Sequence, residues 1–373
     1  MNFEKNNNPL AGPRVLVAPL DWGLGHATRC IPIICGLQQQ GATVYIAAEG
    51  KLKTLLEKEL KQVVFLPLAG YNIHYSKDPY WFPFSILLQV PKIMVRIYKE
   101  NRWLKSAVKQ YGFDAVIADN RPGLYTNKVP CIYITHQLTI KTGNVVTAWL
   151  AQKMHYYFIN KYSACWVPDN FENKTLAGDL SHPQKTPRLP LQYLGPLSRF
   201  EKTEIAKKYE VLVLLSGPEP QRTFFEKKLL EELRPFTGNV LFIRGLPGES
   251  PELTPQNKNI TMHNHLPAAT LGMAIQQSKM VICRSGYTTI MDLVALQQKA
   301  VVVPTPGQTE QEYLAKYLME NGLFPCMVQE NFSLLAALQT AAGFTYKVLD
   351  THLHQYKKVI QDFVSVLKNR SVI

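Results

Sequence analysis

Short apolar runs of strand-like composition alternate with helix-like segments along almost the whole chain. The first apolar run covers 14–19, and a helical pattern over 27–40 follows it, with Ile31, Ile34 and Leu37 on one face. Strands separated by helices form a parallel sheet with helices on both faces, so the pattern predicts an α/β fold. Further strands are expected over 43–47, 63–66, 115–118, 131–135, 164–167, 210–215, 240–243, 280–283 and 300–303, and a further helix over 51–60.

The alternation is interrupted once, by a proline-rich stretch. Four prolines fall between residues 183 and 196, which is typical of a linker, and a second alternating series begins at residue 210. We therefore expect two tandem Rossmann-like domains that face a cleft, because open α/β sheets bind ligands at the carboxyl ends of their strands. The predicted first domain spans 1–190, the second spans 191–347, and a C-terminal helix within 348–373 crosses back to the first domain.

The composition is that of a globular protein in a reducing compartment. Hydrophobic residues make up 46% of the chain and charged residues 18%, and no run of about 20 apolar residues could span a bilayer. The first nine residues are polar and lack the apolar stretch of a signal peptide. The six cysteines form no C-x-x-C pair, which indicates reduced thiols. We therefore expect a cytoplasmic protein.

The net charge of +13 is concentrated in the first half of the chain. Residues 1–200 contain 23 Lys/Arg against 12 Asp/Glu, whereas residues 201–373 contain 18 against 16. This asymmetry favours an anionic partner. Aromatic and aliphatic residues alternate with Lys and Arg over 75–109, which suits peripheral binding to the inner face of an anionic membrane, with Trp81 and Phe82 at the headgroups. The alternative is a core helix with a solvated basic face and a lid over 80–84. No nucleic-acid-binding motif accompanies the charge, so nucleic acid is not an expected partner.

The strand over 280–283 ends in a small polar turn, and a helix opens directly after it. Backbone N–H groups and the positive end of the helix dipole would face the phosphates of a nucleotide diphosphate. Asp292, one turn further into the helix, would accept hydrogen bonds from ribose hydroxyls. A second strand end, at Pro304, leads into another polar loop. The turn and the helix start consist of Arg284, Ser285, Gly286, Thr288 and Thr289.

A third strand end in the second half carries Ser216 and Gly217, and this loop could also hold a phosphate. Pro218 and Pro220 cannot donate N–H bonds, which makes the loop a poorer phosphate site than a glycine-rich one. A stiff turn without a ligand is the alternative.

The first strand of the chain ends in a turn with Gly23 and Gly25, which permit close approach of the backbone to a ligand. His26 then stands at a helix start. It is a candidate general base or acceptor-binding residue, since an ordinary histidine pKa suits proton abstraction at neutral pH. The alternative is a histidine that caps or packs the helix. Thr28 replaces the third glycine of the dinucleotide-binding motif, which argues against a nicotinamide cofactor.

Asp119, His136 and Gln137 end two further strands of the first half. Both strand ends should point into the same cleft as His26, where Asp119 would orient His26 or bind acceptor hydroxyls. Ordinary loop polarity is the alternative. The chain has no Asp-x-Asp triplet, no metal-ligand spacing and no P-loop, so neither a metal nor another cofactor is expected.

Together these motifs resemble inverting glycosyltransferases of the GT-B fold, in particular glycosyltransferase family 28. Residues 283–293 are similar to the donor motif of that family, and residues 303–313 are similar to its Pro…Gln loop. The turn at 23–26 resembles the family's Gly-x-Gly-Gly-His turn with one glycine fewer, and 135–137 resembles its His-Glu-Gln loop without the Glu. The resemblance follows both domains in order and is strongest over 260–325.

The resemblance implies an enzyme that moves a sugar, N-acetylglucosamine or another hexose, from a UDP-sugar to an acceptor hydroxyl with inversion and without a metal. The acceptor would be a lipid or a lipid-linked saccharide, held near Gly23, Gly25, His136 and Gln137. In the implied donor site Asp292 takes the ribose hydroxyls, Ser285, Gly286 and Thr289 line the diphosphate, and Gln308, Gln311 and Glu312 read the sugar hydroxyls.

Two other functions are compatible with these motifs. An isomerase similar to UDP-N-acetylglucosamine 2-epimerase would convert the nucleotide sugar without any acceptor, and it would need further carboxylates in the cleft. A non-catalytic protein would bind the nucleotide sugar and show no turnover.

Overall fold

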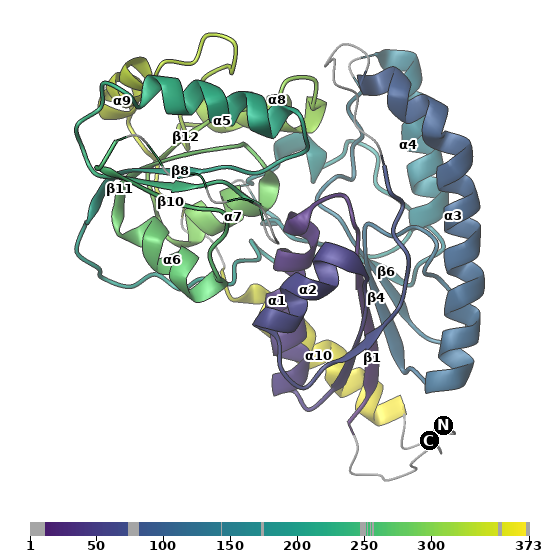
Figure 1. Cartoon of the computed structure of the whole chain (residues 1–373). Helices are drawn as coiled ribbons and strands as arrows, with labels where there is room; N and C mark the ends of the chain where they lie inside the picture. Colours follow the sequence, from purple (N-terminus) through teal and green to yellow (C-terminus); the bar gives the residue numbers. More distant parts are fainter. Residues whose placement is uncertain are drawn as a thin grey trace. The chain divides into compact units, whose positions relative to one another are not determined.

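The computed structural model describes residues 12–370 except 74–81, 143, 173–174, 247–250, 252, 254, 256 and 350–352. The predicted α/β class and the two Rossmann-like units are confirmed (Figure 1). The first unit contains residues 1–73, 87–197 and 352–373, and the second contains 74–86 and 198–351. Tyr80 and Trp81 of the predicted lid and membrane contact lie outside the described residues, so those predictions stay open.

The first unit is built on a parallel sheet of seven strands in the order β3-β2-β1-β4-β5-β6-β7. The central strands β4 and β5 are buried along their whole length, and β1 is buried except at its first residue, as their apolar composition requires. The strands are β1 (Arg14–Pro19), β2 (Thr43–Ala47), β3 (Val64–Leu66), β4 (Ala115–Asp119), β5 (Cys131–Ile134), β6 (Ala164–Val167) and β7 (Leu191–Tyr193), and the helices are α1 (Leu24–Gln39), α2 (Gly50–Glu59), α3 (Phe82–Tyr111), α4 (Val145–Ile159) and α10 (Gln355–Arg370).

Helices cover both faces of this first sheet. One face packs into a core that includes Leu104 of α3 and Ile159 of α4. On the other face α1 packs against α10, and Phe363 of α10 meets Trp166 of β6 edge to face at 5.2 Å. The segment after residue 352 therefore belongs to the first unit, although the second unit precedes it in the chain.

The second unit repeats the plan with five parallel strands in the order β10-β9-β8-β11-β12. Helices α5 and α9 contribute Phe225 and Ala337 to the core on one face, and Figure 1 shows α6 on the opposite side of the sheet. The elements are β8 (Tyr209–Leu214), α5 (Gln221–Glu232), β9 (Val240–Ile243), β10 (Ile260–His263), α6 (Ala268–Gln276), β11 (Ser278–Cys283), α7 (Tyr287–Ala295), β12 (Ala300–Val302), α8 (Thr309–Glu320) and α9 (Leu334–Gly343).

Several elements were absent from the sequence prediction, among them β7, β10 and α4. Strand β7 lies inside the proline-rich stretch, where its prolines flank the strand rather than interrupt it. It completes the first sheet, and the two units divide between Leu197 and Ser198, whereas the predicted boundary lay between 190 and 191. Strand β10 is only half buried, so it lacks a continuous apolar run. Helix α4 directs much of its apolar surface outward, so its pattern is not that of a core helix.

The strand order of each sheet reverses at one point, where the chain leaves one side of the first strand and returns on the other. In the first unit this point lies between β1 and β4, and in the second it lies between β8 and β11. At such a point the loops after neighbouring strands diverge and leave room for a ligand beyond their carboxyl ends. The residues that follow these four strands are therefore the first place to look for a site.

Helix α10 should contribute to the stability of the first unit through Ile360. This side chain is fully buried, and a Cβ at Gly36 of α1 would stand only 2.8 Å from its Cδ1 atom. We expect Ile360→Ala to lower the free energy of unfolding by about 2–5 kcal/mol, because it leaves a cavity between two helices. Val366→Ala, at a half-exposed position of the same helix, should change it by less than about 0.5 kcal/mol. Urea unfolding followed by circular dichroism checks this, and equal effects of the two variants would contradict it.

Candidate functional site

The predicted pair His26 and Asp119 is brought together in the first unit. Asp119 is the last residue of β4 and pairs in register with Pro19 at the end of β1, so the turn into α1 passes directly over it. His26 lies in the first turn of α1, and its Nδ1 atom is 3.1 Å from Oδ2 of Asp119. The carboxylate is fully buried, whereas 18% of the His26 side chain is exposed. The histidine can therefore meet a substrate while the carboxylate stays behind it.

Arg29 joins this pair, and the sequence analysis did not identify it. It lies one helical turn after His26 and is 2% exposed. Its Nε atom donates to Oδ2 of Asp119 at 2.8 Å, and its Nη2 atom donates to the other carboxylate oxygen. The sequence signal that could have identified Arg29 is its spacing from His26, because residues three apart on a helix share a face.

The buried surroundings of His26 lower its pKa. Burial has the largest effect, Arg29 adds to it, and Asp119 opposes both, so the pKa lies below its usual value of 6.5. For Asp119, burial would raise the pKa of the carboxyl, but Arg29 and then His26 outweigh it and hold the pKa well below its ordinary range. Near neutral pH the site thus contains an ionised carboxylate and an unprotonated imidazole.

His136 belongs to the same cluster. It follows β5, whose last residue Ile134 pairs in register with Asp119. The ring is 4% exposed, and its Nδ1 atom lies 3.1 Å from Nη1 of Arg29. Gln137 is oriented through its backbone, which donates to Thr135 Oγ1 at 3.0 Å. His136 is therefore buried against Arg29. Gln137 is the more accessible of the two predicted acceptor residues.

The turn before α1 contains Gly23 and leads directly to His26. Gly23 has a φ of 138°, which favours glycine, and a Cβ there would meet no atom of the described residues within 4 Å. Asp21 anchors the turn by accepting backbone N–H bonds from Tyr71 at 2.9 Å and Asn72 at 3.1 Å. Gly25 lies inside the first turn of α1, where its carbonyl accepts from Thr28 Oγ1 at 3.0 Å.

In the second unit, α7 begins where the sequence predicted a phosphate-facing helix. Gly286 is its N-cap residue, and a Cβ on Gly286 would meet no atom of the described residues within 4 Å. Thr288 and Thr289 follow in the first turn and are partly exposed. Ser285 is fully buried, and its hydroxyl donates to the carbonyl of Gln311 at 2.8 Å. The N-terminus of α7 thus has open space in front of it, while Ser285 fastens the turn to α8.

Arg284 points away from this open space. Its guanidinium is 1% exposed, stacks 4.3 Å from the ring centre of Phe225, and donates to the carbonyls of Pro304 and Gln221 at 3.0 Å each. These bonds tie the ends of β11 and β12 to the start of α5. The sequence predicts that Arg284 contacts the diphosphate. From its contacts we expect it to support the donor loops instead.

The loop between β12 and α8 holds the predicted sugar-reading residues together. Gln311 Oε1 accepts from the backbone of Thr305 at 2.9 Å, and its Nε2 donates to Gln308 Oε1 at 2.5 Å. Glu312 accepts from the backbone of Gly307 at 2.9 Å. These polar side chains define the shape of the loop, which lies next to the N-terminus of α7 through the Ser285 bond.

The loop after β8 also reaches this place. Gly217 has a φ of 105°, and a Cβ there would stand 3.6 Å from Oγ1 of Thr305. That hydroxyl is buried and has no hydrogen-bond partner among the described residues. The following helix start is held by Arg222, which donates to Glu219 at 2.5 Å. Ser216 and Gly217 therefore lie beside the β12 loop on a braced, proline-containing turn.

Asp292 lies near two residues that the sequence analysis did not identify. Ser198 Oγ donates to its Oδ1 atom at 2.7 Å, and Arg199 is close enough to lower its pKa. Burial is the stronger effect and raises the pKa of Asp292 to about 6. The Nε and Nη1 atoms of Arg199 are buried without a hydrogen-bond partner among the described residues. A carboxylate acceptor within α7 and a cation with unsatisfied donors thus lie near each other.

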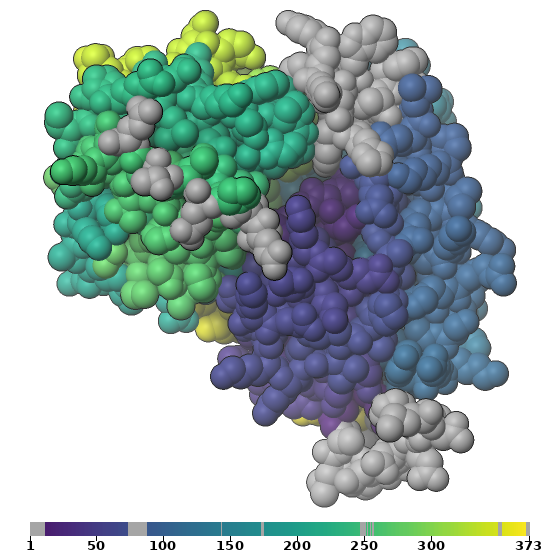
Figure 2. Space-filling model, in the orientation of Figure 1, coloured from purple at the N-terminus to yellow at the C-terminus, as the bar shows by residue number. Residues whose placement is uncertain are grey.

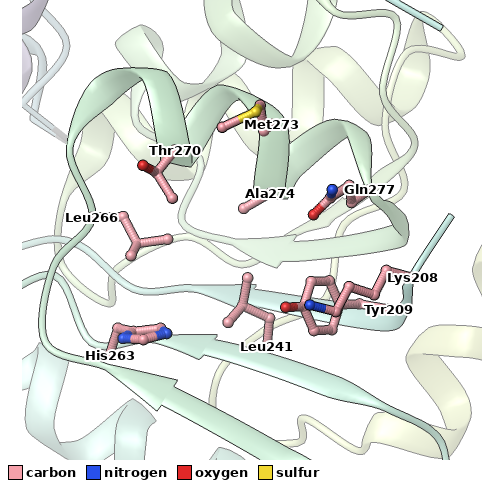
Figure 3. A pocket seen from close by; sticks show the side chains of 9 residues that line it. All are labelled: Lys208, Tyr209, Leu241, His263, Leu266, Thr270, Met273, Ala274 and Gln277. Atoms are coloured by element: carbon pink, nitrogen blue, oxygen red, sulfur yellow. The ribbon is translucent and has the colours of Figure 1, made fainter. Parts of the chain in front are cut away.

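A separate pocket of about 200 Å³ lies between α6 and the sheet of the second unit (Figure 3). It is smaller than typical ligand sites of about 300–1,000 Å³, and none of the predicted donor residues lines it. We therefore do not place the nucleotide there. Its lining consists of Lys208, Tyr209, Leu241, His263, Leu266, Thr270, Met273, Ala274 and Gln277.

The described part of the chain contains no group of three or more His, Cys, Asp or Glu side chains arranged to hold a metal ion. The same part of the chain has no helix long and apolar enough to cross a membrane. The predicted independence from metal remains a prediction.

Comparison with known proteins supports the sequence interpretation. Residues 240–345 match the glycosyltransferase family 28 C-terminal domain. A UDP-N-acetylglucosamine–N-acetylmuramyl-(pentapeptide) pyrophosphoryl-undecaprenol N-acetylglucosamine transferase from Haemophilus ducreyi is 21% identical over 350 residues, which cover 90% of this chain and 91% of the relative.

Solved structures show the same fold at low identity. Arabidopsis thaliana UGT89C1, determined in complex with UDP-L-rhamnose, has a TM-score of 0.65 and 10% identity, covering 97% of this chain and all of the other. Acinetobacter baumannii MurG has a TM-score of 0.51 and 15% identity, covering 96% and 99% of the two chains.

The raised pKa of Asp292 makes a prediction about stability. Because the folded state binds this proton more tightly than the unfolded state does, the side chain costs stability as the pH rises from about 4 to 6. Asp292→Asn keeps the acceptor for Ser198 and removes the charge. We expect it to raise the free energy of unfolding by about 1–3 kcal/mol at pH 7.5 and to have little effect below pH 4. Thermal unfolding of both proteins at the two pH values checks this; a loss of stability at pH 7.5 would contradict it.

Proposed function

We propose that this chain, a GT-B glycosyltransferase with a family 28 C-terminal domain, transfers a sugar from a UDP-sugar to a hydroxyl of a lipid-linked acceptor with inversion. N-acetylglucosamine is the first sugar to test, because the Haemophilus ducreyi relative is named for its transfer. The named relatives are transferases, which favours transfer over the epimerase and over a non-catalytic binding protein.

The observation that carries the proposal is the 3.1 Å contact between His26 and the buried Asp119 at the switch point of the first unit. Transfer to a hydroxyl needs a base that takes its proton as the oxygen attacks. An imidazole with a lowered pKa is unprotonated at neutral pH, and a buried carboxylate stabilises the imidazolium that forms. His26 would take the proton on Nε2, and Asp119 would hold the charge.

The donor would bind in the second unit at the N-terminus of α7. The diphosphate would lie in the open space before Gly286, where the backbone N–H groups and the helix dipole stabilise negative charge. Asp292 would accept hydrogen bonds from the ribose, and Arg199 would supply a cation nearby. Sugar hydroxyls would be read by Gln311 and its neighbours Gln308 and Glu312.

The departing group of this reaction is UDP, whose negative charge grows as the glycosidic bond breaks. The positive end of α7 and the Arg199 guanidinium would stabilise this charge, so we propose that the reaction needs no metal. The acceptor oxygen must approach the anomeric carbon to about 3–3.5 Å for attack.

The decisive experiment incubates the protein with UDP-N-acetylglucosamine and the lipid-linked muramyl-pentapeptide acceptor of the relative, with and without EDTA. We expect UDP release only when acceptor is present. His26→Ala should retain UDP affinity and lower transfer about 100-fold or more, whereas Asp292→Asn should weaken UDP binding about tenfold because an ionised acceptor is lost.

Four results would count against this assignment. Conversion of the donor without acceptor indicates the epimerase, and binding of UDP without turnover on any acceptor indicates a binding protein. Unchanged UDP affinity in Asp292→Asn removes the proposed ribose site. Loss of activity in EDTA rejects metal independence.

We further propose that the first unit binds the surface of an anionic membrane, peripherally and on its inner face. Helix α4 exposes apolar side chains along one face at helical spacing, and Lys153 lies 3.7 Å from the ring centre of Trp149. Figure 2 shows α3 at the surface of the same unit, where Tyr98 and Arg102 are in contact. Large apolar side chains with nearby cations favour anionic headgroups. The exposed residues of α4 are Val145, Val146, Trp149, Leu150, Met154 and Tyr157.

The membrane proposal predicts a specific effect of Leu150→Glu. Leu150 is 59% exposed, so the substitution should leave the fold intact. It should weaken binding to phosphatidylglycerol vesicles about tenfold or more at low salt, because it removes about 1.5–3 kcal/mol of apolar burial. Leu335→Glu, at a 67% exposed position of α9 in the second unit, is the matched control and should bind like the unmodified protein. Vesicle sedimentation measures both, and equal behaviour of the two variants would reject α4 as the contact.

A further inference from the structure

Arg29 occupies the centre of a buried cluster drawn from three elements. Helix α1 supplies His26, Arg29 and Cys30, strand β4 supplies Asp119, and the segment after β5 supplies His136. The guanidinium binds the carboxylate with two parallel bonds, and its nitrogens also lie 2.9 Å from Nδ1 of His26 and 3.1 Å from Nδ1 of His136. It thus reaches every other ring and carboxylate of the cluster, which an ion pair that served stability alone would not require.

The Nδ1 atom of His26 faces two incompatible partners. Asp119 Oδ2 lies 3.1 Å away and, when ionised, can only accept a hydrogen bond. Nη2 of Arg29 lies 2.9 Å away and can only donate. In a neutral ring, Nδ1 either carries the proton and donates to Asp119, which leaves Nε2 free as a base, or accepts from Arg29, which places the proton on Nε2. Only the first arrangement can abstract a proton at the exposed side of the ring.

We propose that Arg29 is a positioning residue that selects the base-competent form of His26 by holding Asp119 as an ionised acceptor for Nδ1–H. The proposal rests on the proposed transferase function, in which His26 is the base. The bidentate geometry supports this choice, because Nε and Nη2 of Arg29 are aligned with the two carboxylate oxygens and fix the plane of Asp119. Oδ2 then keeps a direction in which it can accept from His26.

Arg29 should also set the pH at which the base is active. Burial lowers the pKa of His26 most, and the positive charge of Arg29 lowers it further; Asp119 raises it, and His136 adds a smaller lowering effect. Cys30, which donates its thiol hydrogen to Asp119 at 3.6 Å, has a pKa raised well above the ordinary value by burial and carries no charge near neutral pH. A base works only above its pKa, so removal of the Arg29 charge should move the acid limb of the activity profile to higher pH.

The test measures His26 directly in the full chain by ¹⁵N NMR of labelled histidine, with no substrate present. We expect the neutral ring of the unmodified protein to carry its proton on Nδ1. Arg29→Gln should raise the pKa of His26 by about 0.5 or more, as expected for loss of a neighbouring cation. Arg29→Lys keeps the positive charge but cannot form the two parallel bonds to Asp119. It should therefore leave the pKa of His26 closer to that of the unmodified protein and give a mixture of His26 tautomers.

Activity gives a second, separate measurement. In Arg29→Lys, kcat should fall about tenfold or more while KM for the UDP-sugar stays within about twofold. Arg14→Gln is the matched control. Arg14 is the first residue of β1 and donates to the carbonyl of Tyr111, whereas Asp119 pairs with Pro19 at the other end of β1. The substitution should therefore change neither the tautomer nor the acid limb.

The outcomes separate this inference from the proposed function. A neutral His26 protonated on Nε2 in the unmodified protein overturns the inference without any variant, as does an unshifted pKa in folded Arg29→Gln. If Arg29→Gln does not fold, a single Nδ1–H tautomer in Arg29→Lys overturns it. If the NMR results agree with expectation but no acceptor is glycosylated, the proposed function fails and the role of Arg29 in setting the histidine stands.

Discussion

The buried carboxylate of Asp119 is the constraint on which the candidate site of the first unit depends. It lies at the end of a central strand with no exposure to solvent, where an uncompensated charge would cost several kcal/mol. Arg29 compensates that charge from the neighbouring helix, so the register between β1 and β4 and the rotation of α1 must both be correct for the unit to fold well. The same rotation of α1 leaves part of the His26 side chain exposed, while Asp119 and Arg29 are buried. Stability and chemistry therefore share one set of contacts.

The second unit solves the corresponding problem differently. Asp292 is also buried, but its nearest partner is a neutral hydroxyl, and the guanidinium of Arg199 is less closely engaged. Its pKa consequently rises, whereas that of Asp119 falls. The unit tolerates this cost within α7, and a hydroxyl-rich ligand would relieve it by adding hydrogen-bond donors. A purely structural carboxylate is usually fully hydrogen-bonded, so an incompletely satisfied one is compatible with a binding role.

The sequence was sufficient to predict that polar residues gather at one edge of each sheet, because the carboxyl ends of parallel strands lie at the same edge. It could not predict side-chain direction. Arg284 follows β11 directly and was assigned to the donor, yet its guanidinium turns inward to hold two loops. Arg29 was overlooked for the opposite reason, since a charged residue within an apolar helix pattern is usually solvated. Strand β7 was missed because its three residues are too few to stand out from the prolines around them.

Donor binding and proton abstraction depend on different titratable groups, Asp292 and His26, and so should be lost at different pH values on the acid side. Asp292 must be ionised to accept from a ribose, and its pKa of about 6 applies to the free protein. His26 must be unprotonated to act as a base, and its pKa also lies below 6.5. Because kcat/KM reports the free enzyme and kcat reports the substrate complex, the acid limb of kcat/KM includes both groups. In the complex, hydrogen bonds from the ribose would favour the ionised form of Asp292 and remove it from the profile. The acid limb of kcat should then reflect the protonation of His26 alone. It should lie at lower pH than the acid limb of kcat/KM, and its slope should correspond to the loss of one proton.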